Sequence, residues 1–161
     1  MIKEKDKRLT NEYLRDLELK AKQLNKDAIY ELACLYSKGE IVSLSKEMSI
    51  NLFTLSSNLG NKDASFELGM IYFNRKNYSM SKRYFLRSSR KESFFYLGMI
   101  EENGYIKTSS LTSALDYYLI GAKLGQKECI KKVIAFYKGG LGVKKNDFLA
   151  NKYQKLLDKD K

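Results

Sequence analysis

Residues 66–72 read Phe-Glu-Leu-Gly-Met-Ile-Tyr, and residues 95–101 read Phe-Tyr-Leu-Gly-Met-Ile-Glu. The two stretches are identical at five of their seven positions. A second echo, Asn-Lys-Asp-Ala, occurs at residues 25–28 and again at residues 61–64. Recurrence with a period of about 20–50 residues is typical of a repeat array, in which each unit packs on its neighbours.

Aligning these echoes gives four copies of one helical pattern, small-x-x-x-apolar-small-x-x-Tyr-x-x-Gly. The copies begin at Ala28, Ala64, Ser93 and Cys129. Small residues let two helix backbones approach closely, and the large apolar residues between them fill the seam. The expected buried seam residues are Leu32, Leu68 and Leu97.

A second helix is expected after each first one. A side chain that can accept a hydrogen bond from a free backbone N–H stands at the start of three of these helices. These residues are Ser45, Ser110 and Asn146. A glycine with positive φ is expected to end the first helices, except in the second copy, where a short turn at Lys76-Asn77 is predicted instead.

These residues resemble the Sel-one-like repeat family, relatives of the tetratricopeptide repeats. The best match is Tyr137 to Asn146 followed by Ala150, which is similar to the family's Tyr-x-x-Gly-x-Gly-Val-x-x-Asp followed by Ala. The resemblance covers about residues 28–157. It implies an all-α, right-handed α-solenoid of about four helix-turn-helix repeats, and adaptor work between proteins.

We expect one domain over residues 1–161. Thr10 is placed to cap an N-terminal capping helix that carries an apolar stripe up to Leu24, and Leu9 and Leu14 are placed as a hydrophobic staple across that cap. The expected units are this helix (residues 9–26), a first repeat (27–62), a short tetratricopeptide-like second repeat (63–91), a third repeat (92–127), and a fourth repeat with the C-terminal helix (128–161).

The composition excludes several kinds of chemistry. The chain has no histidine, so catalysis by a histidine base and metal binding by histidine are excluded. Cys34 and Cys129 have no partner at metal-ligand spacing, which favours reduced thiols in the cytoplasm. The charged N-terminus predicts no signal peptide, and no apolar run is long enough to span a membrane. We expect no catalytic residue, cofactor or metal, and a cytoplasmic location without membrane partners.

Two local motifs suggest chemistry at first sight. Residues 139–142 read Gly-Gly-Leu-Gly, but the Gly-Lys-Ser/Thr of a phosphate-binding loop is missing, so a turn between helices is favoured. Glu101 and Glu102 are adjacent carboxylates, but adjacent helix positions do not face each other, so a solvated helix end is favoured over a shared proton or metal.

The chain has 30 basic and 19 acidic residues, a formal net charge of +11. Such an excess makes nucleic acid and acidic proteins candidate partners. Most of it lies in residues 107–161, and a second group forms a stripe on the second helix of repeat two. That stripe is either a solvated outer face, which we favour, or a binding patch: Lys82, Arg83, Arg87, Arg90 and Lys91.

The first helices should line the concave side of the array, with residues two positions from each seam leucine facing inward. Repeats two and three place Phe and Met there, and an exposed patch of these residues is typical of a binding groove, the alternative being that they belong to the core. We predict a non-catalytic adaptor, regulator or immunity-type protein whose groove holds a peptide or helix of another protein. Nucleic acid is the less favoured partner because the inner face lacks repeated polar side chains. The predicted partner-binding residues are Tyr30, Phe66, Met70, Phe73, Phe95, Met99 and Glu102.

Overall fold

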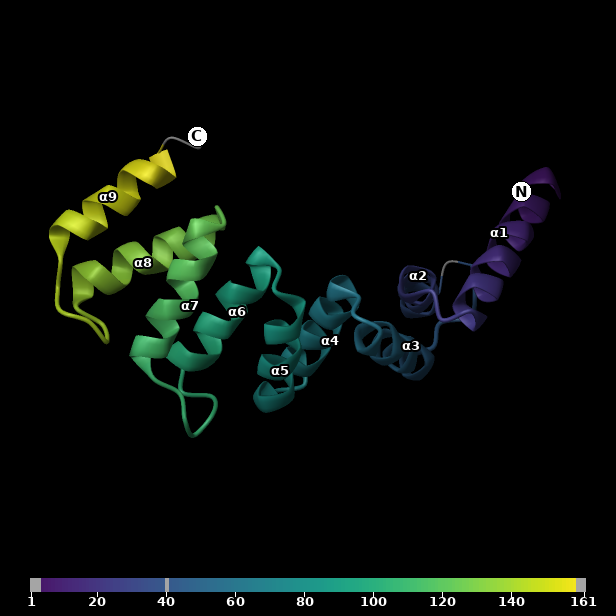
Figure 1. The fold of residues 1–161 in the computed structure, drawn as a ribbon, viewed down its shortest axis with the longest axis horizontal. Coiled ribbons are helices and arrows are strands. Elements are labelled where there is room, and N and C mark those ends of the chain that lie inside the picture. Colours follow the sequence, from purple (N-terminus) through teal and green to yellow (C-terminus); the bar gives the residue numbers. More distant parts are fainter. Residues whose placement is uncertain (1–3, 40, 159–161) are drawn as a thin grey trace. The chain divides into compact units, whose positions relative to one another are not determined.

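A computed structural model describes residues 4–39 and 41–158, with side chains from residue 10 onward. This part of the chain forms nine α-helices and no strand, in agreement with the predicted all-α repeat fold (Figure 1). The helices are α1 (Glu4–Lys22), α2 (Lys26–Lys38), α3 (Lys46–Asn58), α4 (Lys62–Asn74), α5 (Tyr78–Ser88), α6 (Lys91–Glu102), α7 (Leu111–Lys123), α8 (Lys127–Gly139) and α9 (Asp147–Asp158).

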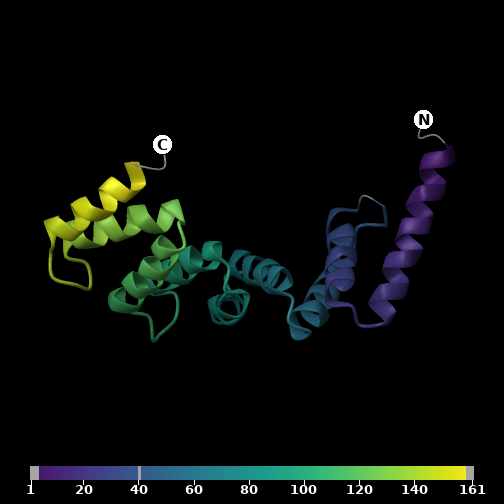
Figure 2. The same cartoon turned by 45° about the horizontal axis from the view of Figure 1, so that its top comes forward.

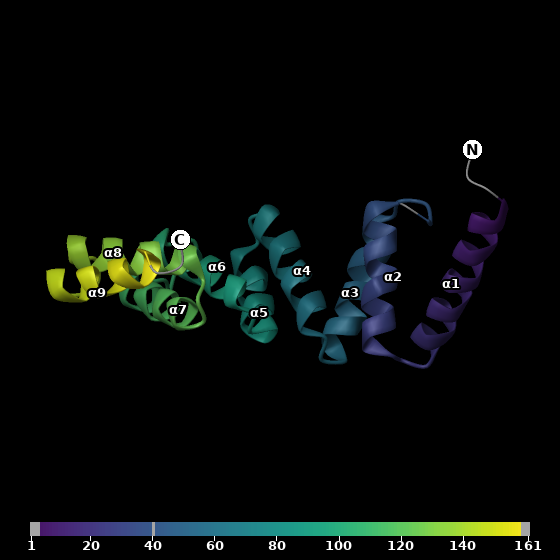
Figure 3. The ribbon, with the colours of Figure 1, turned by 90° about the horizontal axis from the view of Figure 1, so that it is seen from above.

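The chain divides into two compact units, one ending at Leu68 and the other beginning at Gly69, so the boundary lies inside α4. In unit one, α2 packs against both α1 and α3. In unit two, each helix from α5 to α9 packs against the next, and α6 also contacts α8. Figure 2 shows α9 running back along α8 after the loop of residues 140–146, and Figure 3 shows α1 and α2 side by side. Packing between sequence neighbours is the pattern of a repeat array.

The Asn-Lys-Asp-Ala echo is a helix-capping motif. Asn25 Oδ1 accepts hydrogen bonds from the backbone N–H groups of Asp27 and Ala28 at the start of α2. Asn61 Oδ1 accepts one from Ala64 N–H at the start of α4, at 2.7 Å. Asn61 is buried, and its Nδ2 donates to Asp27 Oδ1 at 2.8 Å. The asparagine therefore caps its own helix and, in repeat two, also holds the previous repeat.

One core cluster of unit one joins α1 to α2. Its buried members are Leu17, Ala28, Leu32 and Leu35. The predicted cap at Thr10 is wrong, because α1 begins at Glu4 and continues through Thr10. The run of charged residues before Thr10 contains no helix breaker, so the helix extends toward the N-terminus. Leu24 lies beyond the end of α1 with a φ of 60° and is exposed, so it does not belong to the apolar stripe; the side chain of Leu9 lies outside the described residues.

Unit two depends on glycines inside helices. A Cβ on Gly98 would lie 2.2 Å from the ring of Tyr118, and one on Gly69 would lie 2.5 Å from the ring of Phe85. Each aromatic ring therefore lies directly against the backbone of the facing first helix. This is the close approach that the small positions of the repeat predict. One buried core cluster of the unit joins α7, α8 and α9 and consists of Ala114, Leu115, Tyr118, Ala122, Cys129, Ile130, Val133, Ile134, Phe136 and Ala150.

Apart from the cap at Thr10, the predicted helix ends are confirmed. The side chains of Ser45, Ser110 and Asn146 accept backbone hydrogen bonds at the starts of α3, α7 and α9. The glycines after the first helices of repeats one, three and four have positive φ, and in the shortened second repeat Lys76 takes that conformation with a φ of 58°. The seam residues Leu32, Leu68 and Leu97 are buried as predicted, with exposed fractions of 8%, 0% and 0%.

Candidate functional site

The seven residues predicted to contact a partner are all half-buried, so each keeps part of its surface accessible to solvent. Tyr30 lies on α2 and Phe66 on the first part of α4, both in unit one. The other five lie in unit two, on the remainder of α4 and on α6: Met70, Phe73, Phe95, Met99 and Glu102.

In unit one, Tyr30 lies against the buried ring of Phe53, with ring centroids 5.8 Å apart. Burial raises the pKa of Tyr30, and its contact with Cys34 acts in the same direction. Burial also raises the pKa of the Cys34 thiol, although its hydrogen bond with Tyr30 opposes this effect. Cys34 is therefore a protonated thiol at neutral pH, which makes it a poor nucleophile.

In unit two, a row of aromatic rings connects α4 to α6. The ring of Tyr96 meets Phe73 edge-on at 5.3 Å between centroids and Phe95 at 5.6 Å. Met70 lies three positions before Phe73, and Met99 lies three positions after Tyr96, so each methionine shares the helix face of its aromatic neighbour. We call Met70, Phe73, Phe95, Tyr96 and Met99 the aromatic–methionine surface.

The buried rings of Phe85 and Tyr118 support this surface from the core side. Phe85 stacks on Tyr96 with centroids 5.0 Å apart, and it is fully buried. Phe95 packs against the core of unit two and lies 6.3 Å from the ring of Tyr118. Phe95 is thus partly a core residue, whereas Met70 and Met99 are not members of that core cluster.

Sequence reasoning missed Tyr96, Tyr78 and Tyr105. Tyr78 stacks on Tyr105 at 4.1 Å between centroids and meets Phe73 edge-on at 5.5 Å, which extends the aromatic row. Tyr105 N–H donates to Ile100 O after Gly104, the backbone pattern in which the residue after the glycine makes an apolar contact. For Tyr105, the sequence signal was a glycine followed by a tyrosine, Gly104-Tyr105, at the end of α6.

Glu102 does not lie at a solvated helix end. Its Oε2 accepts a hydrogen bond from Tyr118 Oη at 2.6 Å and one from Lys132 Nζ at 2.8 Å. Burial raises the pKa of Tyr118, and the hydrogen bond to Glu102 raises it further. The carboxylate therefore ties α6 to α7 and α8 and is already paired within the chain.

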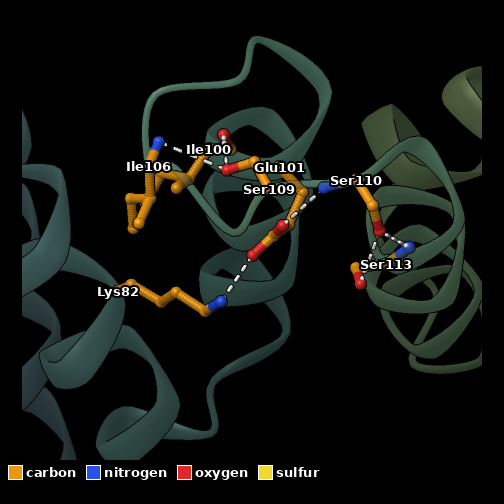
Figure 4. A network of polar contacts seen from close by, with 7 residues as sticks. All are labelled: Lys82, Ile100, Glu101, Ile106, Ser109, Ser110 and Ser113. Carbon is orange, nitrogen blue, oxygen red and sulfur yellow. Dashed lines mark hydrogen bonds and ion pairs between the residues drawn. The ribbon is translucent and has the colours of Figure 1, made fainter.

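Glu101 does not lie in solvent either, because only 2% of it is exposed. Figure 4 shows its carboxylate between Lys82 and Ser110. Its Oε1 accepts from Lys82 Nζ of α5 at 2.5 Å, and its Oε2 accepts from Ser110 N–H at 3.1 Å. The loop between α6 and α7 folds back over the helix end, where Ser109 Oγ donates to Ile100 O. This loop buries a carboxylate that sequence spacing placed in solvent.

The predicted basic stripe lies on α5 and at the start of α6. Lys82 is half-buried and paired with Glu101, so it serves packing rather than an open patch. Arg90 forms the N-cap of α6, and its Nε lies 3.4 Å from Glu92 Oε2. Arg83, Arg87 and Lys91 are exposed.

The described residues contain no cluster of three or more Cys, Asp or Glu side chains able to hold a metal ion. The interpretation of residues 139–142 as a turn holds for residues 140–142, because Gly139 is still part of α8. Gly140 ends α8 with a φ of 67°, and Gly142 has a φ of 63°. Within the described part of the chain, none of the helices is both long and apolar enough to cross a membrane.

Comparison with known families finds the Sel1 repeat, the Sel-one-like repeat of the sequence analysis. Its model matches four segments of the chain: residues 26–61, 62–93, 95–126 and 135–153. Sel1 repeats generally mediate interactions between proteins, and the family is typically a non-enzymatic scaffold.

Two solved structures share this fold. One is a protective antigen present in uropathogenic Escherichia coli strains, displaying an SLR fold, with a TM-score of 0.85 and 17% identity. The other is a Sel1 repeat protein from Oxalobacter formigenes, with a TM-score of 0.77 and 23% identity. They match 91% and 86% of this chain, which spans only 33% and 58% of their lengths. A comparison with curated proteins finds no match.

Proposed function

Because the chain belongs to the Sel1 repeat family, we propose that it is a non-catalytic protein-interaction module, an adaptor, regulator or immunity-type protein. It binds a peptide or a helix of its partner along the first helices of its repeats. Its two cysteines are both free, which suits a cytoplasmic protein.

The aromatic–methionine surface carries this proposal. Phe73, Phe95 and Tyr96 hold one another by edge contacts, so they lose little freedom when a partner covers them. Met70 and Met99 are flexible and polarisable, and methionine adapts its shape to different apolar partners. Rigid rings flanked by adaptable side chains are a common composition for the centre of a protein interface.

The chemistry of this surface indicates an apolar partner segment. None of its five members carries a charge, so binding should draw on buried apolar area and should weaken little with added salt. In unit one, Tyr30 and Phe66 occupy the corresponding first-helix positions and belong to the same proposal.

The first experiment identifies the partner by crosslinking from the surface itself. A photo-crosslinking amino acid replaces Met99, and the protein is irradiated in a lysate of its source. The control carries the same group in place of Leu86, which lies on α5 and is 47% exposed. A partner that crosslinks from position 99 and not from position 86 is then purified.

The second experiment tests the surface with that purified partner. We expect Met70→Ala/Met99→Ala to weaken binding by about tenfold or more, because each lost apolar contact at an interface centre costs on the order of 1 kcal/mol. The unfolding midpoint should change little, since both side chains are half-exposed. Leu86→Ala should bind like the wild type. Equal binding by the double variant and the wild type would overturn the proposal.

A further inference from the structure

The C-terminal helix α9 has two different faces. One face packs on the core of unit two through Ala150, Tyr153 and Leu157. The other presents Phe148, which is 78% exposed, and Leu156, which is 43% exposed. Leaving most of a phenylalanine in water is unfavourable, because burying apolar surface would gain about 25 cal/mol of free energy for each Å².

This second face borders a cavity in unit two. The cavity has a volume of about 870 Å³, within the range of pockets that hold ligands or partner side chains. It lies between the C-terminal end of α7 and the exposed side of α9, and it is lined by Ala122, Lys123, Phe148, Asn151, Lys152, Tyr153, Gln154, Lys155 and Leu156.

The spacing of these residues defines a helical stripe. Phe148, Lys152, Lys155 and Leu156 stand at positions i, i+4, i+7 and i+8 of α9. Residues at this spacing lie on one side of a helix, above one another. We call Lys123, Phe148, Lys152, Lys155 and Leu156 the C-terminal docking face.

The charge of the docking face has one sign. Its three charged residues are lysines, and none of the cavity-lining residues is acidic. No ion pair joins Lys123, Lys152 or Lys155 to another residue in the described part of the chain. Elsewhere in unit two, Lys82 and Lys132 do have carboxylate partners. The docking face therefore offers three ammonium groups around an apolar centre.

We propose that the C-terminal docking face binds an acidic amphipathic helix of another protein. The partner helix places apolar side chains on Phe148 and Leu156 and in the cavity. Its flanking Asp or Glu residues pair with Lys123, Lys152 and Lys155. Such docking resembles the packing within the repeats, in which each helix packs on its neighbour through an apolar face.

The shape of the site favours a helix over a flat partner. A cavity admits side chains that project from a helix, whereas a bilayer surface would leave it unfilled. The three lysines favour a partner that carries carboxylates, because opposite charges across an interface attract each other. The docking face shares no residue with the aromatic–methionine surface, so either proposal can fail alone.

The test is a selection from a display library of helical peptides with randomised surface positions, using the complete chain as target. We expect the enriched peptides to carry Asp or Glu beside an apolar stripe. Synthetic copies should bind Lys152→Glu/Lys155→Glu and Phe148→Ala about tenfold or more weakly than the wild type. Phe148 is so exposed that its loss should leave the unfolding midpoint unchanged.

The matched control is Lys46→Glu/Lys62→Glu, which makes the same charge change on unit one. Both positions lie in first turns of helices, where glutamate is tolerated, and this variant should bind the peptides like the wild type. Peptides without acidic enrichment, peptides that bind both charge variants equally, or no enrichment at all would overturn the proposal. So would a dimer that Phe148→Asp disperses, or binding to anionic vesicles that Phe148→Ala abolishes.

Discussion

Lys82 of α5 and Glu101 of α6 form an ion pair around an almost completely buried carboxylate. Lys82 Nζ lies 2.5 Å from Glu101 Oε1, and the two side chains are 26% and 1% exposed. Ser110 N–H donates to the second carboxylate oxygen, so both oxygens have a partner. Glu101 thus joins α5, α6 and the start of α7, at a position where the other repeats have tyrosine.

Replacing Lys82 should destabilise the fold more than an ordinary surface mutation does. Lys82→Met leaves the Glu101 carboxylate buried without its counter-charge, and we expect a loss of about 3 kcal/mol in the free energy of unfolding. Arg83→Met changes an exposed neighbour on the same helix and should stay within about 0.5 kcal/mol of the wild type. Urea unfolding followed by circular dichroism measures both.

Neutralising the carboxylate provides the rescue. Adding Glu101→Gln to Lys82→Met removes the unpaired charge, so the double variant should be more stable than Lys82→Met alone. If Lys82→Met unfolds at the same urea concentration as Arg83→Met, the ion pair does not stabilise the fold as the structure indicates.

Gly98→Ala should destabilise the protein although alanine is the better helix former. The new Cβ would lie 2.2 Å from the ring of Tyr118, and forcing the helices apart costs roughly 1–3 kcal/mol. Gly139→Ala is the matched control, because its Cβ would meet only the side chain of Leu141 at 3.3 Å. Thermal unfolding should show a lower midpoint for the first variant alone. Equal midpoints would mean that α6 and α7 do not pack this closely.

The repeat fold could be predicted because its determinants are local. The seam leucines, the helix caps and the glycines that end helices each depend on residues within a few positions, so four copies in register determine the architecture. Thr10 shows where this reasoning fails. A residue able to cap a helix does so only if the preceding residues leave the helix, and the charged residues before it form a further turn.

The candidate sites depend on contacts between residues far apart in the sequence. Glu101 and Lys82 are 19 positions apart, and Glu102 and Lys132 are 30 apart. Sequence spacing identified neither pair and indicated solvated carboxylates instead. Helix spacing places Phe73 and Met99 in one predicted site, whereas the aromatic neighbours of Phe73 depend on how α5 and the loop before α7 pack. The docking face on α9 had no signal in the repeat pattern.

The two cysteines should differ in reactivity. Burial raises the pKa of the Cys129 thiol to about 12, and Cys129 has no exposed surface. Cys34 is half-buried and also has a raised pKa, chiefly through burial. At pH 8 a thiol reagent should modify Cys34 slowly and Cys129 only after unfolding. Mass spectrometry of digested protein distinguishes the sites, and rapid modification of native Cys129 would contradict its burial.

The raised pKa of Cys129 also predicts a pH dependence. The thiol of an unfolded chain has a pKa of about 8.5, so above this pH the unfolded state loses its proton while the folded state keeps it. The contribution of Cys129 is therefore complete below about pH 8.5 and falls by up to about 1.4 kcal/mol per pH unit above it, until the folded thiol also ionises. Relative to Cys129→Ala, the wild type should lose stability between pH 9 and pH 11 in urea titrations. Parallel pH profiles would contradict the prediction.

Nucleic acid should bind this chain only weakly despite its charge of +11. Of the five basic residues on and beside α5, Lys82 and Arg90 already have carboxylate partners, so fewer charges remain to neutralise phosphates. Binding that depends on phosphate contacts releases counterions and falls steeply with salt, so we expect affinity for a 20-mer duplex to be measurable at low salt and lost at about 150 mM. Fluorescence anisotropy with Arg83→Ala/Arg87→Ala/Arg90→Ala as the comparison measures it. Submicromolar binding at 150 mM that the triple variant abolishes would make the α5 face a nucleic-acid site and would displace the interaction-module proposal.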